Sequence, residues 1–136
     1  KNGLVAMTLK DTSDRWIKKE LLNKFGIDQS AAKSICMVQS GILFLQKNDI
    51  NEYLLRDWCN LAINNPEYFD DNLSSESDNF IEHRHDQSVL TLLLNEYRIN
   101  GIHDETYFED WNSREKYYYP IWALRNARFN SKINIF

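Results

Sequence analysis

The sequence predicts an α/β protein that is rich in helices and has a few short strands. Amphipathic stretches with apolar residues at helical spacing alternate with short runs of β-branched and apolar residues. Seven Tyr, seven Phe and four Trp supply bulky side chains for a core. The length of 136 residues is that of one ordinary domain, so we expect residues 1–136 to form a single folding unit.

The first part of the chain predicts a strand, a helix and a second strand region. The strand is LVAMTL, residues 4–9, and the polar turn KDTSD follows it. A helix capped by Ser13 or Asp14 should run to the stop at Gly26. Its apolar face consists of Trp16, Ile17, Leu21, Leu22 and Phe25. After a polar segment, ICMVQSGILFLQ predicts two brief strands or one bulged strand of buried sheet, because Gly41 interrupts it.

The second half predicts two long helices with a loop between them. The first helix starts at Asn48 or Asp49 and ends before Pro66. Residues 70–79 are acidic and Ser-rich, which indicates a loop. The second helix, apolar over most of its circumference and therefore largely buried, runs from Asp86 towards Gly101. Beyond it we expect extended and irregular structure, with a short helix near Trp122 to Arg125.

Charge and cysteine content exclude several classes of protein. The net charge of −4 argues against a protein whose main partner is nucleic acid. Cys36 and Cys59 form no CxxC pair, so neither a zinc knuckle nor a disulfide framework is indicated, and a reducing, cytoplasmic setting fits. The longest apolar runs are far too short to cross a bilayer.

The stretch FIEHRHDQSVLTLLL, residues 80–94, begins as a charged cluster and ends as an apolar run. If the helix starts at Asp86 or the next residue, the Asp86 carboxylate lies at the positive end of the helix dipole and can cap it. In an extended segment side chains alternate, so His83 and His85 would point one way and Arg84 the other. The cluster is either a helix start alone or a helix start that also carries a functional site.

Two ligand chemistries suit this cluster. His83 and His85 can share a metal ion, although the HxHD spelling lacks the further Asp-His pair and later histidines of the binuclear metallohydrolases that it resembles. Arg84 and a helix N-terminus suit a phosphate or carboxylate. The alternative for Arg84 is an ion pair with Glu82 or with the acidic loop.

Three segments follow one another along the chain: QSGILFLQKND, LLRDWCNLAINNPEYFDD and FIEHRHDQSVLTLLL. In this order they resemble the C-terminal half of bacterial glycosyltransferase-like proteins of polysaccharide and lipopolysaccharide synthesis. In nucleotide-sugar transferases with a GT-A-type fold, a Q-x-G strand, a Trp-bearing helix and an H-R-x-DQS helix start occur in this order. Here they are Gln39-Ser40-Gly41, Trp58 and residues 83–88. The flanking DRWIKKELLNKFGI and YPIWALRNAR are also similar, so the resemblance covers most of the chain.

The resemblance implies a finer fold class and a function. The fold would be the helix-rich C-terminal portion of a GT-A-like nucleotide-diphospho-sugar transferase, and residues 1–136 would be the acceptor-side part of a larger catalytic domain. The parent protein would transfer a sugar from a nucleotide-sugar donor to a glycan or lipid-linked acceptor in cell-surface polysaccharide synthesis. It would act in the cytoplasm or at the inner face of the membrane.

The resemblance also implies roles for individual residues. Asp86 would contact the acceptor hydroxyl or act as the general base that takes its proton. His83 or His85 would complete the coordination of a divalent cation, Mn²⁺ or Mg²⁺, that bridges the donor diphosphate. The residues implied in substrate binding are Gln39, Ser40, Gly41, Arg84 and Gln87.

One departure from that family pattern concerns the donor. These enzymes hold metal and diphosphate with an Asp-x-Asp segment after an early strand, and none precedes Gln39, since DTSD at residues 11–14 has the wrong spacing. We therefore expect the donor-binding half to lie upstream of Lys1 and the isolated chain to be inactive.

A second class of function is a non-catalytic carbohydrate-binding or protein-interaction module. Aromatic residues that could stack on sugars are Trp16, Trp58, Trp111, Trp122 and Tyr117 to Tyr119. Tyrosines also cluster in cores and interfaces, where the ring is buried and the hydroxyl finds a partner. The basic, aromatic C-terminal tail is compatible with peripheral membrane contact or with packing against the missing half.

Overall fold

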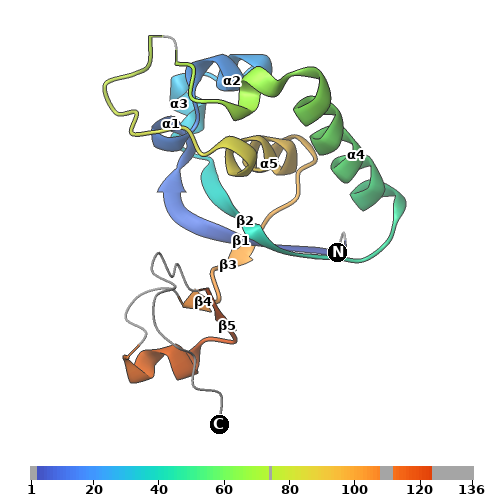
Figure 1. The fold of residues 1–136 in the computed structure, drawn as a ribbon, viewed down its shortest axis with the longest axis vertical. Coiled ribbons are helices and arrows are strands. Elements are labelled where there is room, and N and C mark those ends of the chain that lie inside the picture. Colours follow the sequence, from blue (N-terminus) through green and yellow to red (C-terminus); the bar gives the residue numbers. More distant parts are fainter. Residues whose placement is uncertain (1–2, 74, 108–111, 124–136) are drawn as a thin grey trace, which may run out of the picture. The chain divides into compact units, whose positions relative to one another are not determined.

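The structure, a computed structural model, describes residues 3–73, 75–107 and 112–123. These residues form a mixed α/β arrangement, as predicted, with five α-helices, two short 3-10 helices and five strands. Figure 1 shows the elements in chain order. The chain divides into two compact units, residues 1–104 and 105–136, where the sequence analysis expects one. Each unit has its own small sheet, so each is described by itself.

The first unit contains a three-stranded sheet in the order β2-β1-β3. β1 (Leu4–Thr12) pairs antiparallel with β2 (Cys36–Leu45) and parallel with the short β3 (Ile102–His103). The predicted strand at residues 4–9 is confirmed. It continues to Thr12, so the turn predicted at KDTSD is replaced by strand followed directly by helix.

β2 is one bulged strand, as one of the two sequence alternatives expected. Ala6 faces Leu43 and Thr8 faces Val38, so two steps along β1 correspond to five along β2. The extra residues of β2 form a bulge at residues 39–42. The expectation that this strand is buried is wrong for most of its length, because β2 is an edge strand and its end at Phe44 is 55% exposed.

The helix predicted over residues 13–25 is two shorter helices, α1 (Ser13–Trp16) and α2 (Lys19–Lys24). Ile17 and Lys18 between them have extended backbone dihedrals. Both side chains are fully buried, and because an extended backbone points successive side chains to opposite sides, they are buried in different surroundings, Ile17 in the apolar core and Lys18 against residues 67–72. The stop at Gly26 is confirmed, since its φ of +65° is a left-handed value that favours glycine.

A third short helix, α3 (Gln29–Ala32), lies in the segment that the sequence analysis treats only as polar. Its cap is Asp28, whose side chain accepts a hydrogen bond of 2.8 Å from the Ala31 N–H.

The two long helices confirm their predictions. α4 (Asp49–Asn64) is capped by Asn48, which accepts from the Asn51 N–H at 2.9 Å, and the 3-10 helix η1 (Pro66–Phe69) follows it. α5 (His85–Glu96) buries every residue from 88 to 94. Figure 1 shows α5 over the β1/β2 hairpin, with α2 and α4 beside it. The core therefore lies around α5, with Ile17, Leu21, Leu22, Met37, Leu54 and Val89 to Leu94 among its members.

The chain after α5 returns to the sheet at Gly101, where the backbone passes very close to β1. A Cβ atom at Gly101 would lie 2.2 Å from the Thr8 hydroxyl oxygen and 2.9 Å from the Ala6 carbonyl oxygen. A side chain cannot fit there, so glycine is required by the close approach of β3 to β1.

The described part of the second unit pairs β4 (Thr106–Tyr107) parallel with β5 (Ile121–Trp122), and the 3-10 helix η2 (Arg114–Tyr118) lies between them in sequence. Trp122, predicted near the start of a short helix, is in β5, and residues 124–125 of that helix lie outside the described residues. Tyr117 and Tyr118 are exposed, so within this unit they do not form a core.

In the described residues, no helix combines the length and apolarity needed to cross a membrane.

Candidate functional site

The predicted cluster at residues 83–87 lies where the loop after η1 enters α5. Arg84 forms an ion pair of 2.8 Å with Glu82, and its guanidinium carbon lies 4.3 Å from the ring centre of Trp16. The Arg84 N–H donates to the Trp16 carbonyl at 3.2 Å. Arg84 is therefore tied to α1 and to Glu82, which is the ion-pair alternative left open by the sequence.

The start of α5 is not capped by Asp86, so that prediction is wrong. The helix begins one residue earlier, and the residue at its N-cap position is Arg84, which has no side-chain cap. The Ser88 hydroxyl ties the start of α5 to α1, because it accepts from the Arg84 N–H at 3.1 Å and donates to the Trp16 carbonyl at 2.9 Å. Asp86 is left exposed, with no hydrogen bond or ion pair to any described residue.

His83 is buried and both of its ring nitrogens are used. Nδ1 accepts from the Lys18 N–H at 3.3 Å, and Nε2 lies 2.8 Å from the Tyr68 carbonyl, to which it donates in the neutral tautomer. Burial lowers the pKa of His83 below its ordinary value. The ring therefore joins the link between α1 and α2 to η1 as a neutral imidazole.

His85 lies beside His83, with ring centres 5.5 Å apart in an edge-to-face contact. The extended segment assumed by the alternation argument is absent, because Arg84 has a ψ of 29° and His85 has a φ of +43°. Its Nε2 is 2.8 Å from a carboxylate oxygen of the exposed Asp71. Among the described residues no three His, Cys, Asp or Glu side chains are grouped to hold a metal ion. Because both ring nitrogens of His83 are used in protein contacts, His83 does not fit the expected divalent cation, and the same role for His85 stays a prediction.

A buried lysine next to this cluster was missed by the sequence analysis. Lys18 is 1% exposed, and its ammonium group forms a 2.9 Å ion pair with Asp70. It also donates to three backbone carbonyls, those of Glu67, Asp70 and Asn72. The hydrogen bond from Lys18 holds the pKa of Asp70 below its ordinary value. A lysine within an amphipathic stretch is normally exposed, so no local signal identifies this one.

The predicted loop at residues 70–79 is confirmed, and hydrogen bonds attach several of its described residues to neighbouring helices. Glu76 accepts from the Lys19 N–H at 2.8 Å, and Ser77 accepts from the Gln29 side-chain amide at 3.0 Å. Further on, the Ile81 N–H donates to the Arg15 carbonyl at 2.8 Å. The approach to α5 is thus fixed against α1, α2 and α3.

The other predicted residues, Gln39, Ser40 and Gly41, lie in the bulge of β2. Thr91 links the strand just before this bulge to the first turn of α5, because its hydroxyl accepts from the Val38 N–H at 3.0 Å and donates to the Gln87 carbonyl at 2.8 Å. The two predicted segments therefore belong to elements that are joined by one buried threonine.

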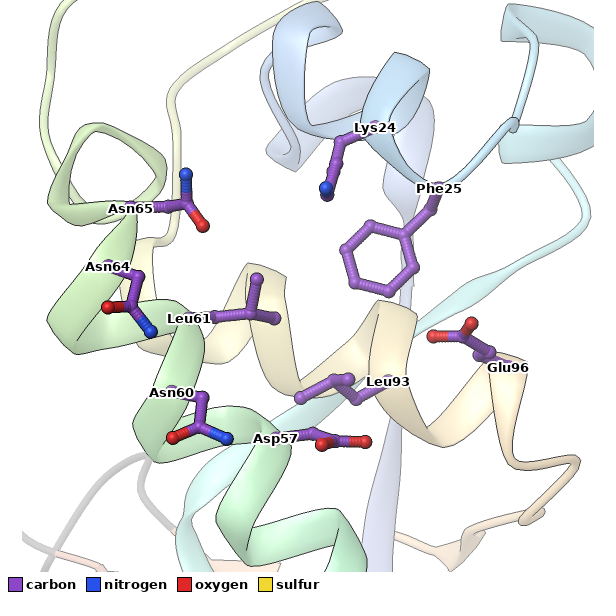
Figure 2. A pocket seen from close by; sticks show the side chains of 9 residues that line it. All are labelled: Lys24, Phe25, Asp57, Asn60, Leu61, Asn64, Asn65, Leu93 and Glu96. Atoms are coloured by element: carbon purple, nitrogen blue, oxygen red, sulfur yellow. The ribbon is translucent and has the colours of Figure 1, made fainter.

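Two clefts of the described part of the first unit are lined by none of the predicted site residues. One, of about 360 Å³, lies between α2, α4 and α5 (Figure 2). The other, of about 530 Å³, has residues of the β2 start and the α5 end in its wall, among them Cys36, Asn95 and Arg98. The sequence signal for the first cleft was the spacing of Asp57, Asn60, Leu61 and Asn64, which places them on one side of α4.

Exposed aromatic residues of the second unit contact one another and a lysine. Tyr117 and Trp122 meet edge to face with ring centres 5.7 Å apart, and the Lys116 ammonium lies 5.3 Å from the Tyr117 ring centre. The basic tail predicted to touch a membrane lies almost wholly outside the described residues, so peripheral membrane contact stays a prediction.

Comparison of the chain with family models, with curated proteins and with solved structures finds no match in any of the three.

Proposed function

We propose that this chain is the acceptor-side part of a glycosyltransferase with a GT-A-like fold, and that Asp86 is its general base. The observation that carries the proposal is the state of Asp86. Its carboxylate is exposed and makes no bond to a described residue, although the residues on either side are anchored. A free carboxylate on a rigid backbone is positioned for chemistry more readily than one used as a cap.

The surrounding contacts support this role by holding Asp86 in place. Arg84 is bonded to Trp16 and Glu82, and His85 is bonded to Asp71. Residues 88–94 of α5 are buried, so the first turn of the helix cannot shift without disturbing the core.

In the proposed reaction Asp86 takes the proton of the acceptor hydroxyl as that oxygen bonds to the anomeric carbon of the donor sugar. The bond from the anomeric carbon to the donor phosphate oxygen breaks, and the nucleoside diphosphate leaves. Gln87 would hydrogen-bond the acceptor beside Asp86, and Gln39, Ser40 and Gly41 would lie along the acceptor from the β2 bulge. The Thr91 bridge supports this pairing of segments, because it ties Val38 to Gln87.

The partners in this proposal are a nucleotide-sugar donor and a glycan or lipid-linked acceptor of cell-surface polysaccharide synthesis, in the cytoplasm or at the inner face of the membrane. No step is assigned to a metal ion, since the histidines expected to bind it are used in protein contacts. Donor binding is assigned to residues outside this chain.

The test uses the natural reading frame, including any coding sequence that precedes Lys1, and measures nucleoside diphosphate release from a panel of sugar nucleotides. Asp86→Asn is compared with Asp49→Asn, which removes another exposed carboxylate from the first turn of a long helix. We expect a loss of about 10²- to 10⁴-fold for Asp86→Asn and no loss for Asp49→Asn.

The two parts of the proposal fail separately. If Asp86→Asn folds normally and keeps full release, Asp86 is not the base. If the unsubstituted protein releases no diphosphate from any donor, the transferase assignment fails. The carbohydrate-binding or interaction module then becomes the better hypothesis, because Tyr117, Tyr118 and Trp122 are exposed close together in sequence.

A further inference from the structure

The cleft between α2, α4 and α5 has an apolar floor and a polar rim. Figure 2 shows Leu61 and Leu93 in its centre and the Phe25 ring directed towards them from the end of α2. Its volume of about 360 Å³ lies within the range of small-molecule sites in proteins.

The rim carries polar groups from three helices. They are Lys24, Asp57, Asn60, Asn64, Asn65 and Glu96. Oδ2 of Asp57 accepts a hydrogen bond of 2.6 Å from the Tyr97 hydroxyl. This bond raises the pKa of Tyr97 to about 12 and fixes the position of the Asp57 carboxylate. Asn65 donates to the Glu67 side chain at 3.0 Å.

The second half of α4 places two amide side chains on the rim of the cleft. Asn60 and Asn64 line the cleft and are exposed, so they can be reached from solvent. The side chains of Asn60, Asn64, Lys24 and Glu96 form no hydrogen bond or ion pair with the described residues, so they are available to a ligand.

The charges and hydrogen-bonding types of the rim restrict the ligand. Among the described residues, Lys24 is the one cationic side chain that lines the cleft, against the carboxylates of Asp57 and Glu96, so an anion such as phosphate is disfavoured. A simple cation would bind the carboxylates but would form no hydrogen bond with the amide N–H groups of Asn60, Asn64 and Asn65. Amide groups both donate and accept, as hydroxyl groups do.

We propose that this cleft is a binding site for a neutral sugar residue. The apolar C–H face of the sugar ring packs on Phe25, Leu61 and Leu93, and its hydroxyl groups bond to the amides of Asn60 and Asn64 and to the carboxylates. The site is distinct from Asp86 and does not depend on the proposed transferase activity. In a glycan-processing protein it would hold a part of the glycan away from the reacting hydroxyl.

The experiment is an NMR titration of the ¹⁵N-labelled chain with glucose, galactose, mannose, N-acetylglucosamine and rhamnose, each as its methyl glycoside, at millimolar concentrations. Signals of the side-chain amides of Asn60 and Asn64 report on the cleft directly. We expect at least one of these glycosides to shift both signals. Asn60→Ala should weaken binding about tenfold through the loss of hydrogen bonds.

Asn23→Ala is the matched control, because Asn23 is an exposed asparagine of α2 that does not line the cleft. It should leave the affinity unchanged. Alanine favours helix, so Asn60→Ala should not impair folding, and the amide spectrum of the variant verifies this.

Two results would overturn the proposal. One is that no glycoside of the panel shifts the Asn60 and Asn64 amides. The other is that inorganic phosphate or methylammonium shifts them at concentrations where the glycosides do not, which would identify an ion site. Because these readouts need no donor and no turnover, they are independent of the diphosphate-release assay.

Discussion

Replacing Lys18 by Met tests the buried lysine most directly. Methionine keeps an apolar stem of similar length and removes the ammonium group. That group is the shared donor for the Glu67, Asp70 and Asn72 carbonyls and the ion-pair partner of Asp70. These contacts join the link between α1 and α2 to a segment 49 to 54 residues away.

The size of the effect follows from the burial of Lys18. A hydrogen bond from a charged donor contributes about 1.5 to 3 kcal/mol, and a buried carbonyl that loses its donor is costly. Water can replace the donor at the exposed Asn72, and a buried Met avoids the desolvation cost of a buried ammonium. We therefore expect Lys18→Met to lower the free energy of unfolding by about 2 to 3 kcal/mol, or the Tm by roughly 10 °C or more.

The assay is urea unfolding followed by Trp fluorescence, with Lys19→Met as the control. Lys19 is adjacent in sequence and exposed, and its backbone rather than its side chain makes the contact to Glu76. Lys19→Met should change the unfolding free energy by less than about 0.5 kcal/mol. Equal stability of the two variants would show that the ammonium group of Lys18 does not hold the loop.

Two further predictions concern His83 and Gly101. Burial lowers the pKa of His83 below its ordinary value of 6.5, so this ring takes up a proton at a higher pH in the unfolded chain than in the folded chain. The stability that depends on neutral His83 is therefore fully present above pH 6.5 and decreases as the pH drops below that value. Urea unfolding between about pH 7 and pH 5.5 should show this loss of stability. His83→Gln should reduce the loss, whereas the control His103→Gln, at an exposed residue, should not change it. The burial argument would be contradicted if the unfolding free energy of His83→Gln depended on pH as strongly as that of the unsubstituted chain. Gly101→Ala forces a methyl group against β1 and should lower the free energy of unfolding by about 1 to 3 kcal/mol. In the control Gly41→Ala the methyl group meets no atom within 4 Å, so the free energy of unfolding should hardly change. Equal urea midpoints for the two variants would mean that β3 does not approach β1 this closely.

The long helices were predictable because their signals are local. In α4, apolar residues at helical spacing, the cap at Asn48 and the stop before Pro66 all lie within or next to the helix. In α5 the apolar run from Val89 to Leu94 predicts burial directly. The bulge in β2 was also foreseeable, since Gly41 interrupts an apolar run.

The break between α1 and α2 was not predictable, because its cause is distant in sequence. The periodic pattern passes through Ile17 and Lys18 without interruption. The chain leaves the helical conformation there, and the Lys18 N–H meets the ring of His83, 65 residues away. A local pattern holds no information about a partner at that distance.

The position of the charged cluster at the start of α5 was predictable, but its internal contacts were not. The sequence analysis expects Asp86 to cap the helix, and in the folded chain no side chain caps it. The helix start is tied instead through Ser88, whose hydroxyl bonds to the carbonyl of Trp16, 72 residues earlier. Asp86 is thereby left exposed, and its catalytic role stays a prediction.

By itself the sequence determined the mixed α/β class, the two long helices and the buried face of α5, since residues three or four positions apart decide helical periodicity. Tertiary structure alone decided that Lys18 is buried, that His83 is a neutral link, and that a cleft opens beside Asn60 and Asn64. The physical reason is that burial and hydrogen bonding depend on which segments meet in space, and those segments are tens of residues apart along the chain.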